Sequence, residues 1–93
     1  MSIGSLTVVL RLPEAQSLKD KRQVVKSLIE VVRRRFNVAV AEVDDLEQWR
    51  RATIGIVCVS NDAAHTNRML DKVLDFIESN PAYTVAEVEM EML

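Results

Sequence analysis

The sequence has few of the residue types that most catalytic and metal-binding motifs need. It contains one cysteine, one histidine, two glycines, two prolines and four aromatic residues among 93. A single cysteine excludes an internal disulfide and any multi-cysteine metal site. There is no GxGxxG, no P-loop and no Ser/His/Asp spacing. The sequence therefore carries no catalytic signature and predicts no cofactor or metal, which favours a protein that is not an enzyme.

Long hydrophobic runs are also missing. No stretch approaches the roughly 20 apolar residues that a membrane-spanning helix needs. The N-terminus lacks the basic region and the cleavage site of a signal peptide, and its apolar residues alternate with polar ones. We therefore expect a cytoplasmic protein with no membrane partner. A hydrophobic content of 48% predicts a globular chain, and its length predicts one domain over residues 1–93.

The charge of the whole chain is small, but its distribution is uneven. The formal net charge is only −2. Between Leu18 and Phe36, however, seven cations stand against two acids, a local charge of +5, so the rest of the chain carries −7. Such asymmetry is more informative about partners than the total.

The spacing of the apolar residues predicts six secondary-structure elements. Period-2 alternation predicts strands, and recurrence every three or four residues predicts helices. Ser17 is a suitable N-cap for the first helix, with Asp20 three positions later as a relative of the capping box. The predicted strands are residues 5–12, 36–43, 49–59 and 84–93, and the predicted helices are 18–35 and a second one between the Ser-Asn-Asp start at 60–62 and the Asn-Pro stop at 80–81.

The predicted order βαββαβ is typical of an α+β, ferredoxin-like sandwich. Two right-handed βαβ crossovers joined by a hairpin give a four-stranded antiparallel sheet of order 4-1-3-2, with both helices on one face. The fourth strand is then an edge. Glu87, Glu89 and Glu91 on its open face would discourage aggregation between sheet edges.

The third strand is apolar on both faces, which one helical layer does not explain. If Ile54, Ile56 and Cys58 face the helices, their neighbours face the other way and form a patch that no predicted helix covers. A clustered apolar patch of this kind is typical of an interface, and a symmetric homodimer is the commonest closed assembly. The candidate interface residues are Val9, Ala39, Ala41, Val43, Gly55, Val57 and Val59.

Other candidate sites are weaker. His65 near the start of the second helix is more typical of an exposed residue than of an acid, base or ligand. The acids at 42–47 lack the glycine and the spacing of a calcium loop. Trp49 is interpreted as an anchor for the hairpin, against the core or a neighbouring protomer, and only weakly as a stacking residue. The open-face positions of the first and third strands offer no aromatic ring of the kind that RNA-recognition domains use.

The start of the first helix, SLKDKRQVVK, has cations where the helix dipole disfavours them. The free N–H groups of the first turn, the dipole and the nearby side chains would together hold a phosphate or carboxylate. The candidate anion-binding or nucleic-acid-binding residues are Lys19, Lys21, Arg22 and Lys26. A competing interpretation is that this helix meets an acidic patch on a partner, such as the 42–47 loop of another copy.

The combination of LRLPEAQSLKDKRQVVKSL, RRRFNVAVAEVDD, a tryptophan opening the third strand and VSND before the second helix closely resembles the small bacterial YlxP-like family of unknown function. The resemblance spans essentially the whole chain and implies a ferredoxin-like fold and a cytoplasmic protein. Family members tend to lie among genes for translation and ribosome maturation, which implies an RNA or ribosome association. The family brings no established catalytic residues.

These observations predict a non-enzymatic, oligomeric domain that contacts RNA or a ribonucleoprotein through the basic start of the first helix. The alternative is a homodimeric regulatory module that binds a small anionic ligand or a protein partner at the protomer interface.

Overall fold

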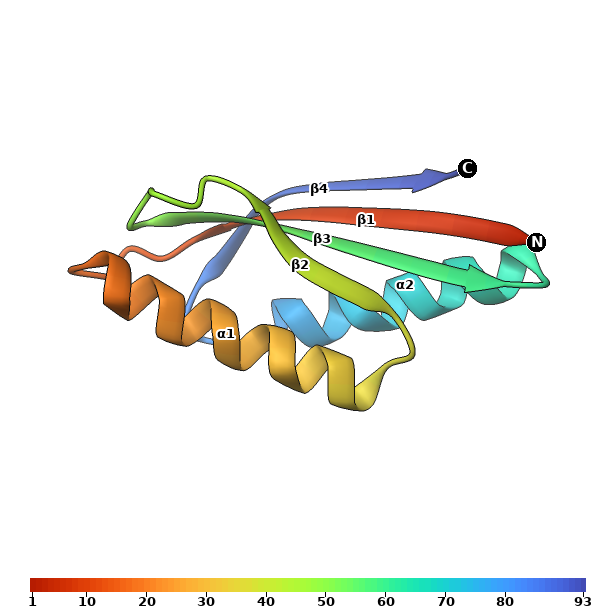
Figure 1. Cartoon of the computed structure of the whole chain (residues 1–93), viewed down its shortest axis with the longest axis horizontal. Coiled ribbons are helices and arrows are strands. Elements are labelled where there is room, and N and C mark those ends of the chain that lie inside the picture. The colour runs from red at the N-terminus through yellow and green to blue at the C-terminus, as the bar shows by residue number, and fades with distance from the viewer.

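The computed structural model describes all residues, 1–93, and contains the six predicted elements in the predicted order (Figure 1). Four antiparallel strands form one sheet of order β2-β3-β1-β4, which is the predicted order 4-1-3-2 read from the opposite edge. Both helices lie on the same side of this sheet. The elements are β1 (Ser2–Arg11), α1 (Leu18–Arg35), β2 (Ala39–Asp44), β3 (Arg51–Ser60), α2 (Ala63–Glu78) and β4 (Thr84–Met92).

Strand β2 begins three residues later than the alternation predicts. Phe36 is the C-cap of α1, and its N–H donates to the carbonyl of Val32 at 2.9 Å. The ring of Phe36 then packs against that of Phe76 on α2, with 5.8 Å between the ring centroids. Aromatic packing between the helices therefore holds this segment out of the sheet.

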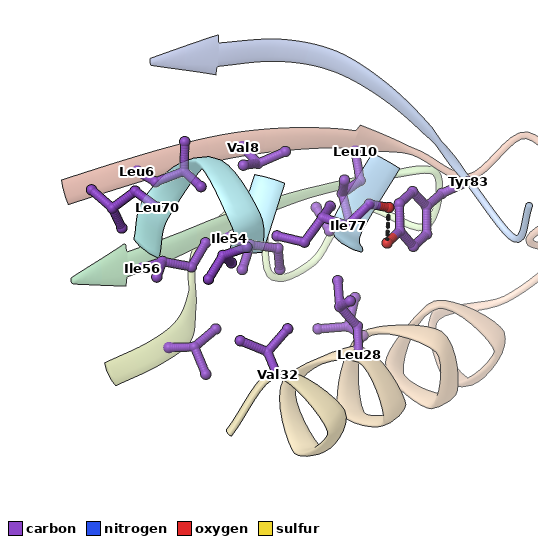
Figure 2. Packing of buried hydrophobic residues seen from close by; sticks show 14 of the residues in the cluster. Leu6, Val8, Leu10, Leu28, Val32, Ile54, Ile56, Leu70, Ile77 and Tyr83 are labelled. Carbon is purple, nitrogen blue, oxygen red and sulfur yellow. Dashed lines mark hydrogen bonds between the residues drawn. The ribbon is translucent and has the colours of Figure 1, made fainter. Parts of the chain in front are cut away.

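The hydrophobic core lies between the sheet and the helices (Figure 2). Its helical contribution is one stripe from each helix at three- or four-residue spacing, as an amphipathic helix on a sheet requires. The fully buried large side chains of the strands belong to β1 and β3, the two central strands. The principal core residues are Leu6, Val8, Leu10, Val25, Leu28, Val32, Ile54, Ile56, Leu70, Val73 and Ile77. Neither helix is long and apolar enough to cross a membrane.

Tyr83, just before β4, closes one end of the core. Its hydroxyl donates a hydrogen bond of 2.6 Å to the carbonyl of Ile77 (Figure 2), and the residue is only 5% exposed. Burial raises the pKa of the Tyr83 phenol from 10.0 to about 12, because the phenolate would lose its hydration.

This raised pKa predicts a loss of stability in alkali. The unfolded chain releases the Tyr83 proton near pH 10, while the folded chain holds it until about pH 12, so the stabilising effect is complete below pH 10 and is lost between these values. We expect the difference in free energy of unfolding between the wild type and Tyr83→Phe to shrink over that range. Urea unfolding at several pH values measures this difference, and a constant difference would contradict the assignment.

Candidate nucleic-acid interface

The first turn of α1 is capped by its own chain. The Asp20 N–H donates to the Ser17 hydroxyl at 3.0 Å, and the Asp20 carboxylate accepts from the Gln16 N–H at 3.0 Å. This is the predicted cap, but the Asp20 carboxylate accepts from the N–H of Gln16, one residue before the N-cap, whereas in the standard capping box it accepts from the N–H of the N-cap residue itself. Asp20 therefore brings a negative charge to the end of the helix. An external anion would have to bind along the side of α1 rather than at its tip.

Lys21 is placed differently from the other cations of this helix. It is completely buried, and its Nζ lies 2.8 Å from the Glu42 carboxylate on β2. The same ammonium donates to the backbone carbonyls of Asp45 and Leu46 at 2.9 and 3.1 Å, with the Arg51 carbonyl at 3.4 Å. Because its three protons are directed at these internal acceptors, Lys21 is not available to an external phosphate.

The Lys21 contacts explain how a cation is tolerated in the first turn. The ammonium lies between the Glu42 carboxylate of β2 and backbone carbonyls of the β2–β3 loop (residues 45–50). This carboxylate and these carbonyl dipoles offset its unfavourable interaction with the helix dipole. The result is a clamp between α1 and this loop. The charge pattern of the sequence places Lys21 among the anion-binding candidates. In the structure Lys21 instead joins α1 to Glu42 and to the β2–β3 loop.

Asp45 gives the β2–β3 loop its shape. Its backbone is left-handed, with φ of 60°, a conformation that aspartate tolerates better than most residues. Its carboxylate accepts from the Thr53 hydroxyl at 2.6 Å and from the Arg51 Nε at 3.0 Å. The Thr53 hydrogen bond is the main reason that the pKa of Asp45 lies below its ordinary value of 3.8, and Arg51 adds to the effect.

The remaining three candidates, Lys19, Arg22 and Lys26, are exposed on α1. Their spacing of three and four residues places them on one stripe of the helix, and Arg33 continues it seven residues later. None of Lys19, Arg22 and Lys26 forms an ion pair within the chain. We call Lys19, Arg22, Lys26 and Arg33 the basic stripe.

A groove of about 440 Å³ runs between the basic stripe and β2. Arg22, Lys26 and Arg33 line it, while Val25 and Ile29 give it apolar surface. Arg33 also donates to the carbonyl of Val40 at 3.1 Å, which ties the stripe to the free edge of β2. The groove contains two acids, Glu30 and Glu42; Lys21 pairs with the second of these. The lining of the groove therefore combines three cations and two acids with three apolar residues.

The opposite, open face of the sheet has two different halves. Ala39, Ala41, Val43, Val57 and Val59 are exposed along β2 and β3. Val43 lies at a β-bulge, where two residues of β2 oppose one of β3, and its side chain occupies the space beside Gly55: a Cβ there would lie 2.9 Å from Val43 Cγ1. Along β4 the same face carries Glu87, Glu89 and Glu91, each exposed.

Val9, the remaining member of the predicted patch, is only 7% exposed. It pairs with Thr53 on β3 and with Glu87 on β4. Arg51 on β3 reaches Glu87 on β4 at 3.4 Å, so this ion pair crosses over β1 beside Val9. Side chains of the same chain therefore already cover Val9.

Trp49 lies in the β2–β3 loop rather than at the start of a strand. It is 52% exposed, so it does not anchor the hairpin in the core. His65 is exposed in the first turn of α2, and Cys58 is a buried free thiol in the core. No group of three or more His, Cys, Asp or Glu side chains is arranged to hold a metal ion.

The sequence contained a signal for the buried position of Lys21 and another for the position of Arg33 on the basic stripe. Lys21 falls on the buried stripe of α1, four residues before Val25, so its position indicates an inward-facing side chain. Arg33 is seven residues after Lys26, which places it on the basic stripe. The contacts of Lys21 with the loop carbonyls, in contrast, had no signal in the sequence.

Comparison with known proteins identifies relatives but no activity. Residues 3–90 match the family described as "Protein of unknown function (DUF503)". The chain is also 40% identical over 68 residues to the uncharacterized protein YlxP of Bacillus subtilis strain 168, a match that covers 73% of this chain and 74% of that protein.

Proposed function

Because the chain belongs to the DUF503 family of proteins of unknown function, we propose its function from its own surface: it is a small domain that contacts the RNA phosphate backbone through α1. The observation that carries the proposal is the basic stripe. Lys19, Arg22 and Lys26 are exposed on one side of the helix without an intramolecular ion pair. Cations near a helix N-terminus are unfavourable in the free protein, and a bound polyanion would offset that cost.

The geometry of the basic stripe suits a backbone ligand. From Lys19 to Arg33 the helix advances by about 21 Å, at roughly 1.5 Å per residue, which is long enough to meet several successive phosphates. One exposed acid, Glu30, lies between Lys26 and Arg33 in the sequence. Contacts of this kind depend on counterion release and carry little sequence preference. Such contacts suit a protein that binds RNA through its backbone, and they do not suit recognition of one particular base sequence.

The test is a triple variant, Lys19→Gln, Arg22→Gln and Lys26→Gln. Its binding to a labelled RNA hairpin, with a duplex stem and a single-stranded loop, is measured against salt concentration. We expect weaker binding at every salt concentration. The slope of log affinity against log salt should fall by about 0.7 to 0.9 for each phosphate that the protein no longer neutralises, and therefore by roughly 2 to 3 for three.

A matched control removes an arginine and a lysine, Arg68→Gln and Lys72→Gln, which are exposed on α2 and also four residues apart. This control should keep the wild-type slope. The proposal fails when the wild type does not bind the hairpin, or when the two variants lose the same affinity. If inorganic phosphate alone protects the wild type from heat while RNA does not, the small-anion alternative is favoured.

A second candidate function, self-association, is favoured by the open sheet face. Val43, Val57 and Val59 are 56%, 43% and 57% exposed, which is unusual for three neighbouring valines on one sheet. We propose that a second copy covers this half of the face. Apolar halves that face each other would leave the glutamates of β4 at the outer rims, where they stay hydrated.

A further inference from the structure

Trp49 is the one exposed aromatic residue of the chain. Phe36 and Phe76 pack against each other, and Tyr83 is buried. Trp49 is 52% exposed, in a chain with only four aromatic residues. Its ring is therefore available for a contact outside the chain.

The loop that carries Trp49 is held against the start of α1. The Lys21 ammonium donates to the carbonyls of Asp45 and Leu46, at one end of the loop. At the other end, Arg50 Nε donates to the Ala15 carbonyl at 3.0 Å, and the Arg50 carbonyl accepts from the Leu12 N–H at 3.0 Å. Figure 1 shows this loop at the same end of the molecule as the first turn of α1. Trp49 therefore lies on a fixed platform at the end where the basic stripe begins.

The surface around Trp49 offers the groups that recognise an unpaired nucleotide. Glu47, Gln48, Trp49 and Arg50 line a shallow, widely open hollow on the surface of the loop. The indole ring supplies a stacking face, the amide and carboxylate supply hydrogen-bonding groups for a base edge, and the guanidinium supplies a phosphate contact. Glu47 is the one acid of the hollow, so the backbone would pass on the side of Arg50.

We infer that the ligand class is single-stranded RNA: one unpaired base stacks on Trp49, while the adjoining backbone meets Arg50 and then Lys19 and Arg22 of the basic stripe. This inference rests on the proposed RNA contact and adds the form of RNA to it. A continuous duplex keeps its base faces stacked inside the helix and cannot offer one to the indole. A single strand, or the loop of a hairpin, can.

Trp49 is also the only tryptophan, so its fluorescence reports the contact directly. The wild-type protein is titrated with a single-stranded RNA of about ten nucleotides, within the usual range for a stacking platform, and with a blunt RNA duplex of the same length. We expect the single strand to quench the tryptophan emission and to bind more tightly. The duplex should bind through the basic stripe alone, with little quenching.

Substitutions at Trp49 separate stacking from charge. Trp49→Ala should weaken single-strand binding by roughly fivefold to more than a hundredfold, the range found when one stacking ring is removed. Trp49→Phe should recover part of the loss, and neither variant should change duplex binding. Leu46→Ala is the matched control, because Leu46 is equally exposed in the same loop, at 53%, but has no ring.

The two proposals fail in different ways. If Trp49→Ala leaves single-strand affinity unchanged, or if the single strand binds without quenching while the basic-stripe variant still weakens its binding, the stacking inference is wrong and the backbone proposal stands. If no RNA binds the wild type, both proposals are wrong.

Discussion

The Lys21→Met variant is expected to lose about 3–5 kcal/mol of its free energy of unfolding, the usual cost of removing one partner from a buried ion pair. Lys21 is fully buried, and methionine is an unbranched apolar side chain that leaves no charge behind. Its removal leaves the Glu42 carboxylate, which is 15% exposed, without its cation. The carbonyls of Asp45 and Leu46 also lose a donor. The loss is large for a domain of this size, whose total stability is expected near the low end of about 5–15 kcal/mol.

Urea unfolding followed by circular dichroism measures this loss. The control is Lys19→Met, two residues away on the exposed side of the helix, which should change stability by about 0.5 kcal/mol or less. If Lys21→Met does not fold, Glu42→Gln replaces it as a milder test, because the amide oxygen still accepts while the charge is removed. Equal effects of Lys21→Met and Lys19→Met would rule out the clamp.

The double variant Lys21→Met with Glu42→Leu separates the ion pair from the backbone contacts. Removing both charges avoids an unpaired carboxylate, so the double variant should be more stable than Lys21→Met alone. It should not recover the wild-type stability, because the loop carbonyls still lack their donor. Lys21 is unsuitable as a probe of RNA binding, because removing its ammonium would also displace the loop that carries Trp49.

The fold could be predicted because burial repeats along the chain with the period of each element. In β1, Leu6, Val8 and Leu10 are all completely buried on the helix side, as their alternation indicates. Ser17 is the N-cap of α1 as predicted, and Asp62, the N-cap of α2, lies within the predicted Ser-Asn-Asp start at 60–62. Local patterns of this kind survive in the structure because they are consistent with the tertiary packing.

The candidate sites were harder to predict because they depend on pairs that are distant in the chain. Lys21 contacts residues that lie more than 20 positions later in the chain. The order of charges along the sequence does not show which acid pairs with it. Val9 is covered because Arg51 reaches across β1 to Glu87, a contact between three strands. Periodicity predicts the face on which a residue lies, but not which long side chains from other strands will cover it.

The Val57→Glu variant is expected to dissociate the proposed homodimer. Val57 lies on the central strand β3, where it pairs with Ala39 on β2 and with Ser5 on β1. In a two-fold assembly the substitution occurs twice, which buries two carboxylates or brings them face to face. Such like-charge contacts cost several kcal/mol, so the dimer should weaken by more than about a hundredfold. The monomer should tolerate the change, since Val57 is 43% exposed in the single chain.

Sedimentation at tens of micromolar measures the mass directly. The wild type should run at twice the 10.5 kDa chain mass, and Val57→Glu at the mass of one chain. Val88→Glu is the matched control: Val88 is 45% exposed on an edge strand and pairs with Val8, whose side chain points to the helix side. It adds the same charge outside the patch and should leave the dimer intact. A wild type that sediments as a monomer at this concentration contradicts self-association, and the exposed valines then need another partner.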